Sequence, residues 1–425
     1  MKSFFLRKKE QPMFGTLIPL FDSQTRVKAY SIFAQKYNSY TNPSFLGTGW
    51  LDGSGSVLGI DIVESMGIQS LTDDKTVFVE VNSVSIFSDI DEQFTDSHDK
   101  LVLLFDHNVT PTDMYVERLK ALKASGYKLA IRKLAVKQFE EYKSVLSLVD
   151  YVLLDHKKID ISKARIYFQK VYPNVSLVAV NVNTQEDYDA LTSDGGYDLY
   201  EGKFFKLPAV NSSKDVSPLK ATYVELLNIV NDPDFDLDKA ASVIEHDTAL
   251  VISLLAMVNR MTVNSGISTV RHAAAMLGQR ELKRWINTAV TRELCADRPS
   301  EITRVSLIRA RFAELLAPVF GMAASSSELF LMGLFSVLDA MLDRPMKEAL
   351  EMVRVSRDIE GALLDGTGKY AQILEFINAY ESANWSEVSR QLVLIGGDDT
   401  AVYDSYTKSL SWYRDLFYGT GSDGK

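Results

Sequence analysis

LVLLF at residues 101–105 is the stretch that decides the fold of the first half of the chain. All five residues are apolar. Similar runs occur at VFVEV (77–81), YKLAI (127–131), DYVLL (150–154) and SLVAV (176–180). Runs that are nearly all apolar, rather than alternating, are typical of strands buried on both faces of a parallel sheet.

The segments between these runs have the period of a helix. In DMYVERLKALKASG (113–126), Met114, Val116, Leu119 and Leu122 recur at helical spacing, and Gly126 is placed to end the helix. Alternating strands and helices predict an α/β barrel or a doubly wound sheet. LIPLFDSQTRVKAYSIF (17–33) predicts an opening hairpin with a polar turn at 22–25.

The pattern changes after KLPAVNSSKDVSP (206–218), where the strand-like runs stop and apolar helical segments continue to the end. The second domain is therefore predicted to be all-α. The predicted organisation is an N-terminal tail at 1–13, an α/β domain at 14–208, a linker at 209–218, a helical domain at 219–415 and a C-terminal tail at 416–425. Met13 is an alternative start to Met1.

Composition limits the classes of function. The 425 residues are 46% hydrophobic and 24% charged, which is ordinary for two globular domains. The formal charge of −10 argues against general nucleic-acid binding. No apolar run approaches the roughly 18–20 residues of a membrane span. The single cysteine, Cys295, excludes an internal disulfide, fits a reducing cytoplasm and is predicted to be a core residue.

VIEHDTALV (243–251) contains a His-Asp pair of the kind that holds metal in one class of phosphohydrolases. Such a site needs several imidazoles and carboxylates, but His272 is the only other histidine in the helical half. Asp247 directly precedes an apolar helical run, where a carboxylate caps the free backbone N–H groups. We therefore predict that Asp247 is a helix cap and that His246 binds no metal.

VIEHDTALVISLLAMVNRMTVNSGISTVRHAAAMLGQRELKRWINTAV (243–290) resembles the core of the HDOD domain, a helical relative of the His-Asp phosphohydrolases that lacks their metal ligands. Thr248 stands where the family usually has proline. The matching positions are Asp247, Leu250, Asn259, Ile267, Ala274, Leu277, Gly278, Leu282 and Trp285. The resemblance continues through 330–350 and 378–385, so it covers most of 210–415.

Three segments of the first half carry a second resemblance: LIPLFDSQTRVKAYSIFAQKY (17–37), DYVLLDHKKID (150–160) and LYEGKFFKLP (199–208). They are similar to the opening, the fifth-strand motif and the closing motif of the EAL family of cyclic di-GMP phosphodiesterases. The resemblance implies a TIM-like α/β barrel that opens with a hairpin. It also implies hydrolysis by a water bridging two divalent ions, which carboxylates and an asparagine hold.

Most of the family's active positions are replaced in this sequence. The resemblance places the naming glutamate at Ser31, an arginine at Gln35, the metal-binding asparagine near Glu80 with Asn82 close by, a glutamate at about Leu104, the paired aspartates at Arg132 and Lys133, the catalytic lysine at Leu153 and a late glutamate at Val180. Only Asp155 is retained. Two cations in place of two carboxylates change the local formal charge from −2 to +2, which repels divalent metal.

We therefore expect no catalytic residue, no bound metal and no cofactor. The expected function is that of a cytoplasmic bacterial signalling protein that acts through protein contacts in cyclic di-GMP-linked control of motility and biofilm formation, with a homodimer as a possible state.

Two alternatives remain open. One is a sensor that binds intact cyclic di-GMP, with Arg132, Lys133, Asp155 and Glu80 as candidate ligand contacts. Arg132 and Lys133 can also be simply a solvated strand end, and strand alternation allows only one of them to face a ligand. The other alternative is a residual phosphodiesterase that uses Asp155 with Glu80.

Overall fold

The computed structural model describes residues 14–36, 38, 40–41, 57–94, 98–207, 218–261 and 267–418. The predicted tail at 1–13, the end of the C-terminal tail and nearly all of the linker lie outside these residues. The chain divides into two compact units, each of which is described by itself. The first unit comprises Met1–Phe205, Arg311–Ser326 and Ile373–Lys425, and the second Lys206–Ala310 and Ser327–Gln372.

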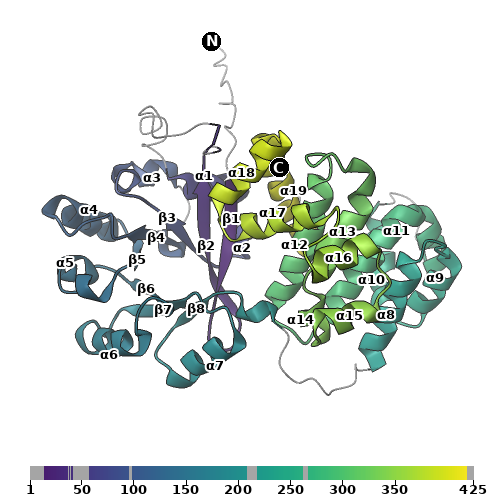
Figure 1. Ribbon diagram of the computed structural model, residues 1–425, viewed down its shortest axis with the longest axis horizontal. Helices are drawn as coiled ribbons and strands as arrows, with labels where there is room; N and C mark the ends of the chain where they lie inside the picture. Colours follow the sequence, from purple (N-terminus) through teal and green to yellow (C-terminus); the bar gives the residue numbers. More distant parts are fainter. Residues whose placement is uncertain are drawn as a thin grey trace, which may run out of the picture. The chain divides into compact units, whose positions relative to one another are not determined.

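Strands β1 to β8 of the first unit form a closed barrel in chain order (Figure 1). β1 is antiparallel to both of its neighbours, β2 and β8, whereas every pairing from β2 to β8 is parallel. The strands are β1 Phe14–Phe21, β2 Val27–Gln35, β3 Thr76–Glu80, β4 Leu101–Asp106, β5 Lys128–Arg132, β6 Tyr151–Asp155, β7 Ser176–Val180 and β8 Leu199–Glu201. The predicted barrel with an opening hairpin is confirmed, and the closure of the sheet excludes a doubly wound one.

Helices connect the parallel strands and cover the outside of the barrel (Figure 1). They are α1 Leu58–Met66, α2 Ile68–Thr72, α3 Ile90–Gln93, α4 Asp113–Ala124, α5 Lys143–Leu146, α6 Ile161–Val171 and α7 Gln185–Asp194. The 3₁₀ helices here are η2 Ser85–Phe87, η3 His98–Lys100, η4 Val136–Gln138 and η5 Phe204–Lys206. The predicted helix is present as α4, and Val116, Leu119 and Leu122 form its buried face. Met114 shares their spacing but is 60% exposed in the first turn.

Side chains of alternate strand residues fill the barrel, as in other closed parallel barrels. This inner cluster consists of Leu20, Ala29, Phe33, Phe78, Val102, Leu104, Ala130, Leu153, Val178 and Leu199. Because side chains alternate, the residues two positions beyond Ala130, Leu153 and Leu199 have the same inward direction. The polar residues at the strand ends are therefore directed toward the barrel opening.

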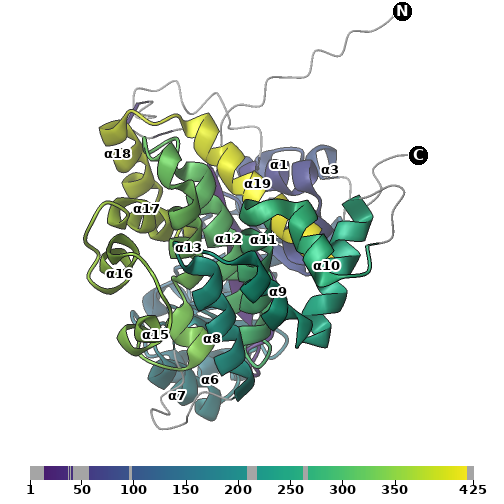
Figure 2. The same ribbon diagram turned by 90° about the vertical axis from the view of Figure 1, so that its right-hand side faces the viewer.

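The second unit is helical, and α11 packs against α8, α9 and α10 (Figure 2). Its helices are α8 Pro218–Asn231, α9 Leu237–Glu245, α10 Thr248–Met261, α11 Val270–Leu294, α13 Ser326–Phe335, α14 Leu338–Leu342, α15 Met346–Met352 and α16 Arg357–Leu364. The 3₁₀ helix η6 Ala323–Ser325, which precedes α13, belongs to the first unit. Gly278 has φ 72° and bends α11, a conformation that glycine adopts without strain. Cys295 is buried, as predicted.

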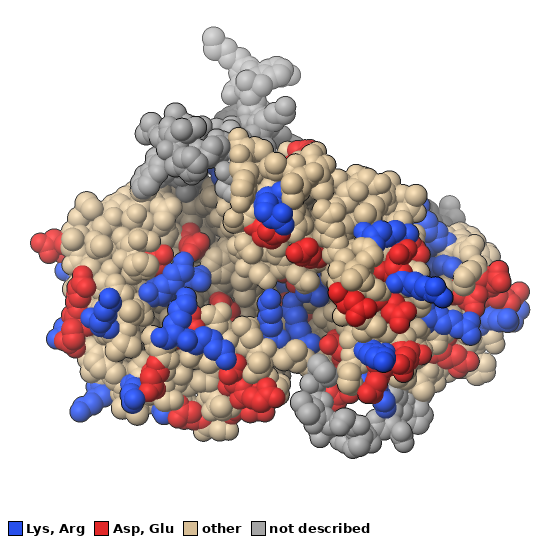
Figure 3. Space-filling model, in the orientation of Figure 1, with Lys and Arg blue, Asp and Glu red and all other residues tan. Residues whose placement is uncertain are grey.

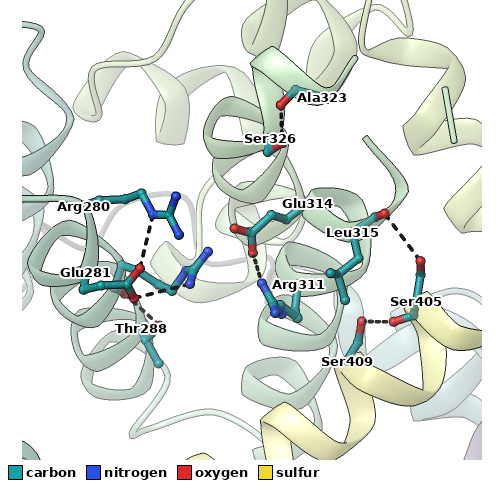
Figure 4. A network of polar contacts seen from close by, with 11 residues as sticks. Arg280, Glu281, Thr288, Arg311, Glu314, Leu315, Ala323, Ser326, Ser405 and Ser409 are labelled. Atoms are coloured by element: carbon teal, nitrogen blue, oxygen red, sulfur yellow. Dashed lines mark hydrogen bonds and ion pairs between the residues drawn. The ribbon is translucent and has the colours of Figure 1, made fainter. Parts of the chain in front are cut away.

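The last helices of the chain belong to the first unit, although the sequence predicts a helical domain that runs to residue 415. They are α17 Ala371–Glu381, α18 Trp385–Ile395 and α19 Asp399–Tyr418, and α12 Ser300–Leu316 ends in the same unit. The Ser405 hydroxyl of α19 donates to the Leu315 carbonyl of α12 at 3.4 Å (Figure 4). The predicted domain boundaries stay a prediction, because compact units are defined by packing and need not coincide with domains.

In the part of the chain that the structure describes, no single helix combines the length and apolar character of a membrane span. α9 and the first part of α10 meet those criteria only as a pair, and they are bent by 118° relative to each other.

Candidate functional site

The carboxyl ends of β2 to β8 meet at one opening of the barrel, which we call the mouth. Parallel barrels carry their ligand and catalytic side chains at this end. The inward or terminal residues here are Ser31, Phe33 and Gln35 of β2, Glu80 of β3, Asp106 of β4, Arg132 of β5, Asp155 of β6, Val180 of β7 and Glu201 of β8. In Figure 3, Lys and Arg side chains gather on the face of the barrel over β5 to β7.

Arg132 is directed into the mouth. Its guanidinium carbon lies 4.9 Å from the centroid of the Phe33 ring, so the cation faces the aromatic ring at cation–π distance. Its Nη1 is buried and has no hydrogen-bond partner within the described residues. A buried N–H without a protein partner is a desolvated donor that can bond a water or a ligand oxygen.

Glu201 faces the same space from β8. Its Oε2 is buried without a hydrogen-bond partner in the described chain. Burial raises the pKa of Glu201, while the charge of Arg132 acts in the opposite direction and that of Asp155 adds to the rise. Sequence reasoning missed this residue. Its only signal is a carboxylate as the last residue of a short apolar strand in LYEGKFF.

Asp155 is already held by neighbours. It accepts hydrogen bonds from Asn181 Nδ2 at 2.7 Å and from the Lys157 backbone N–H at 3.1 Å, and Lys158 Nζ lies 3.3 Å away. Burial opposes ionisation of Asp155, but these three donors outweigh it and hold the pKa below its usual value. The carboxylate that the sequence retains is therefore anionic and engaged in local hydrogen bonds.

Lys133 and Glu80 take less part in the mouth. Lys133 follows β5 with φ 60°, and its Nζ lies 3.6 Å from Asp106 Oδ2. The left-handed backbone turns Lys133 out of the strand, so of the two cations Arg132 is the one that faces inward. Glu80 is exposed at the end of β3, and β4 and β5 separate it from Asp155.

Asn82, the other candidate near β3, has a local structural role. Its Oδ1 accepts the backbone N–H groups of Val84 and Ser85, both at 2.8 Å. This is the arrangement of an Asx turn.

The remaining positions supply few oxygen ligands. Leu104 and Leu153 belong to the inner cluster, and Val180 packs against it. Ser31 lies between the inward residues Ala29 and Phe33 and is fully buried. No group of three or more His, Cys, Asp or Glu residues that could hold a metal ion occurs among the described residues.

The residues present do not fit a pair of divalent ions. Such ions require several converging carboxylate or carbonyl oxygens. The mouth has aliphatic side chains at Leu104, Leu153 and Val180. Its carboxylates lie beside cations: Lys158 is next to Asp155, Lys133 is next to Asp106, and the charge of Arg132 acts on Glu201.

The β1–β2 side of the mouth is covered by the last helices of the same unit. Ala383 and Trp385 pack against the inner cluster. The indole of Trp385 stacks on Phe14 with centroids 5.9 Å apart and an interplanar angle of 22°. The Gly15 N–H donates to the Tyr380 hydroxyl at 3.2 Å. Contacts separated by about 365 residues along the chain thus form one wall of the opening.

In the helical unit, the predicted motif residues have structural roles. Asp247 Oδ1 accepts the Leu250 backbone N–H at 3.0 Å and its Oδ2 accepts the Tyr223 hydroxyl at 2.9 Å, so the predicted cap is confirmed. Asn259 bonds both the N–H and the carbonyl of Ile267, at 2.7 and 2.9 Å. Trp285 is buried in α11.

The two histidines of this unit do not converge. His246 Nδ1 lies 2.6 Å from the Ser242 carbonyl, and His272 is exposed in the first turn of α11.

Comparison with known proteins gives matches for both halves of the chain. Residues 216–358 match the HDOD domain family. The uncharacterized protein YuxH of Bacillus subtilis is 28% identical over 410 residues, which cover 94% of this chain and 97% of that protein. The cyclic di-GMP phosphodiesterase CdgJ of Vibrio cholerae is 27% identical over 311 residues, which cover 72% of this chain and 71% of that protein.

Among solved structures, a calcium and cyclic di-GMP complex of Klebsiella pneumoniae BlrP1 aligns with 46% of this chain at 14% identity and a TM-score of 0.37. The chain spans 55% of the length of that structure.

Proposed function

We propose that this chain, in which residues 216–358 form an HDOD domain, is a regulator in cyclic di-GMP signalling that does not hydrolyse the dinucleotide and acts through protein contacts. Similarity to CdgJ supports the link to cyclic di-GMP. The proposal that the dinucleotide is not hydrolysed rests on the position of Arg132. Its guanidinium is directed into the mouth, and its Nη1 is buried.

The electrostatics of the mouth favour this proposal. A divalent ion 4 Å from a guanidinium is repelled by about 8 kcal/mol at an effective dielectric constant of about 20. The inward aliphatic side chains of Leu104, Leu153 and Val180 supply no oxygen ligand, and Glu201 is one carboxylate whose pKa burial raises. Asp155 is engaged with Asn181 and Lys158, so a metal would have to displace both.

A hydrolysis assay tests this proposal. The full-length protein is incubated with cyclic di-GMP and magnesium or manganese, and the linear product is measured beside an Asp155→Ala variant. We expect both proteins to give the same background rate. Turnover by the wild type that Asp155→Ala abolishes would show that the site hydrolyses the dinucleotide, and the proposal would be withdrawn.

A second candidate function is binding of the intact dinucleotide, which the unpartnered Arg132 Nη1 favours. A phosphate oxygen supplies a charge-assisted acceptor for such a donor. Calorimetric titration with cyclic di-GMP should then give binding that needs no metal and that Arg132→Glu abolishes. Lys120→Glu is the matched control, because it makes the same charge change on the exposed face of α4. Equal affinity of the Arg132→Glu variant and the wild type would remove Arg132 from the site.

The proposal places the protein in the cytoplasm, in the control of motility and biofilm formation, with protein partners; a homodimer is one assembly that it allows. Light scattering on the purified protein gives the oligomeric state directly. Purification with a tag from cells before and after removal of the HDOD region tests whether partners depend on that region.

A further inference from the structure

The turn between α17 and α18 lies against the interior of the barrel. Ala383 is in this turn and Trp385 is the first residue of α18, and both pack on the inner cluster that includes Phe33. Phe33 is also the ring over which the Arg132 guanidinium lies. The turn and the cation therefore share one hydrophobic floor at the mouth.

Polar anchors hold the helices in this position. Asn38 Nδ2 donates to the Ser389 carbonyl at 3.2 Å and to Asp399 Oδ1 at 3.4 Å, and Asn38 is 2% exposed. Gln35 Nε2, at the end of β2, donates to Ser389 Oγ at 3.5 Å. The end of β2 therefore binds the chain's own helices.

The turn itself is strained. Ala383 has φ 53°, a left-handed conformation that costs an ordinary residue about 1–2 kcal/mol. The Ala383 N–H bonds the Tyr380 carbonyl at 3.1 Å and the Asn384 N–H bonds the Ala379 carbonyl at 2.9 Å. These two bonds form a Schellman motif, in which a left-handed residue ends a helix, so Ala383 is the cap of α17 and fixes the direction of the turn.

We propose that the α17–α18 turn is an intramolecular cover over the β1–β2 side of the mouth and that a phosphodiester ligand gains full access to Arg132 only when this cover lifts. Binding of a ligand at the mouth and docking of the α17–α18 turn are then coupled, because both use the floor around Phe33. The identity of the ligand rests on the proposed function, whereas the cover can be tested with no ligand present.

The first experiment measures access to the mouth with no ligand. Ser31→Cys places a nearly isosteric thiol at a fully buried inward position of β2. Its labelling by a methanethiosulfonate reagent is compared in the full-length chain with and without Trp385→Ala. We expect Trp385→Ala to accelerate labelling about tenfold, the effect expected when a cover is closed nine-tenths of the time. The buried Cys295 of the other unit reports unfolding, because it reacts only if the chain opens as a whole.

Two further variants keep this test decisive. Leu394→Ala, at a residue of α18 that is 67% exposed, should leave the labelling rate unchanged. Asn38→Ala weakens one anchor without removing a buried ring, so it tests the cover even if Trp385→Ala destabilises the protein. Labelling that stays at the wild-type rate in both Trp385→Ala and Asn38→Ala would overturn the cover.

The second experiment titrates the same proteins with cyclic di-GMP. We expect Trp385→Ala to bind about tenfold more tightly than the wild type, and Trp385→Ala with Arg132→Glu not to bind. Faster labelling without dinucleotide binding by any variant would support the cover and refute dinucleotide binding at this site. Equal affinity of the wild type and Trp385→Ala, together with unchanged labelling, would refute the cover and leave dinucleotide binding standing.

Discussion

The two sides of the mouth differ in how their polar groups are satisfied. On the β1–β2 side, the Gly15 N–H and the Asn38 amide bond to Tyr380 and Ser389 of the C-terminal helices. On the β5–β8 side, Arg132 Nη1 and Glu201 Oε2 are buried with no partner in the described part of the chain. The backbone and amide groups of the β1–β2 side are thus bonded within the chain, with the Ser31 hydroxyl as an exception, whereas the β5–β8 side has two charged groups with an unpartnered buried atom.

This difference separates a structural contact from a candidate ligand site. A buried polar atom without a partner costs about 1–3 kcal/mol, so a folded protein keeps few of them. Two such atoms of opposite charge in one opening match a ligand that offers both an acceptor and a donor. The β1–β2 side keeps one buried hydroxyl without a partner in the described chain, Ser31 Oγ, but no unpartnered charged group.

The largest effect is expected from removing the partnered side altogether. A chain that ends at Gln372 lacks α17, α18 and α19, so the inner cluster and Phe14 lose their cover. We expect the cooperative unfolding transition of the first unit to disappear from thermal melting followed by circular dichroism. Adding residues 373–418 as a separate peptide should restore part of it. A shortened chain that melts at the wild-type temperature would show that the barrel needs no C-terminal helices.

Tyr380 makes many of the aromatic contacts on the β1–β2 side. Its ring contacts Phe14, Phe312, Phe376, Trp385 and Tyr406. Tyr380→Ala should lower the free energy of unfolding by about 3–5 kcal/mol in urea titrations, because it leaves a cavity at a fully buried position. Tyr380→Phe should lower it by about 1–3 kcal/mol, because the Gly15 N–H loses its acceptor. Tyr40→Ala, at an exposed tyrosine, is the control, and a loss equal to that of Tyr380→Ala would contradict the prediction.

Asn38 tests the polar part of the same side. Asn38→Ala should lower the free energy of unfolding by about 1–2 kcal/mol at pH 7, because the Ser389 carbonyl loses a donor. Asn38→Asp should lower the free energy of unfolding more than Asn38→Ala does at pH 7, because the new carboxylate faces Asp399. At pH 4 the two variants should be closer in stability. Burial already raises the pKa of Asp399, although its bonds with Asn38 lower it in part. Urea titrations of both variants at the two pH values check the order.

The smallest effect is expected on the unpartnered side. Burial raises the pKa of Glu201 above its unfolded value, so its contribution to stability is present at low pH and is lost as pH rises through the folded pKa. Glu201→Gln should therefore stabilise the protein at pH 8 by about 1 kcal/mol, and the gain should vanish below about pH 4. Arg132→Met should destabilise the protein, most strongly at pH 8, because the ionised Glu201 then loses the nearby positive charge. Thermal melting over this pH range measures both, and a gain from Glu201→Gln that is constant with pH would contradict the assignment.

Local patterns were sufficient for most of the fold. The apolar runs of β3 to β7 and the hairpin of β1 and β2 are encoded in neighbouring residues, and so is the cap at Asp247. The packing of the C-terminal helices on the barrel is not encoded locally. It joins Gly15 to Tyr380, which are 365 residues apart, and local periodicity cannot predict such a contact. The resemblance of 378–385 to the end of an HDOD domain also assigned this segment to the helical half.

The candidate site was predicted in part. Arg132 and Asp155 were identified from the motif positions, and the structure places both at the mouth. Lys133 and Glu80 were grouped with them, but the left-handed backbone at Lys133 and the exposed position of Glu80 set them apart. Glu201 was missed because a lone carboxylate at a strand end looks like a solvated residue until closure of the barrel buries it.

The bond between the Gly15 N–H and Tyr380 has a consequence for synthesis of the chain. The first strand leaves the ribosome while its partners in α17–α19 are still about 365 residues from being translated. At roughly 5–20 residues per second, that interval is about 20–70 seconds. During that time Phe14 lacks the rings of Tyr380 and Trp385 that cover it in the folded protein. The rate at which the 3′ end of the message is read therefore sets how long this apolar edge of the first strand stays uncovered.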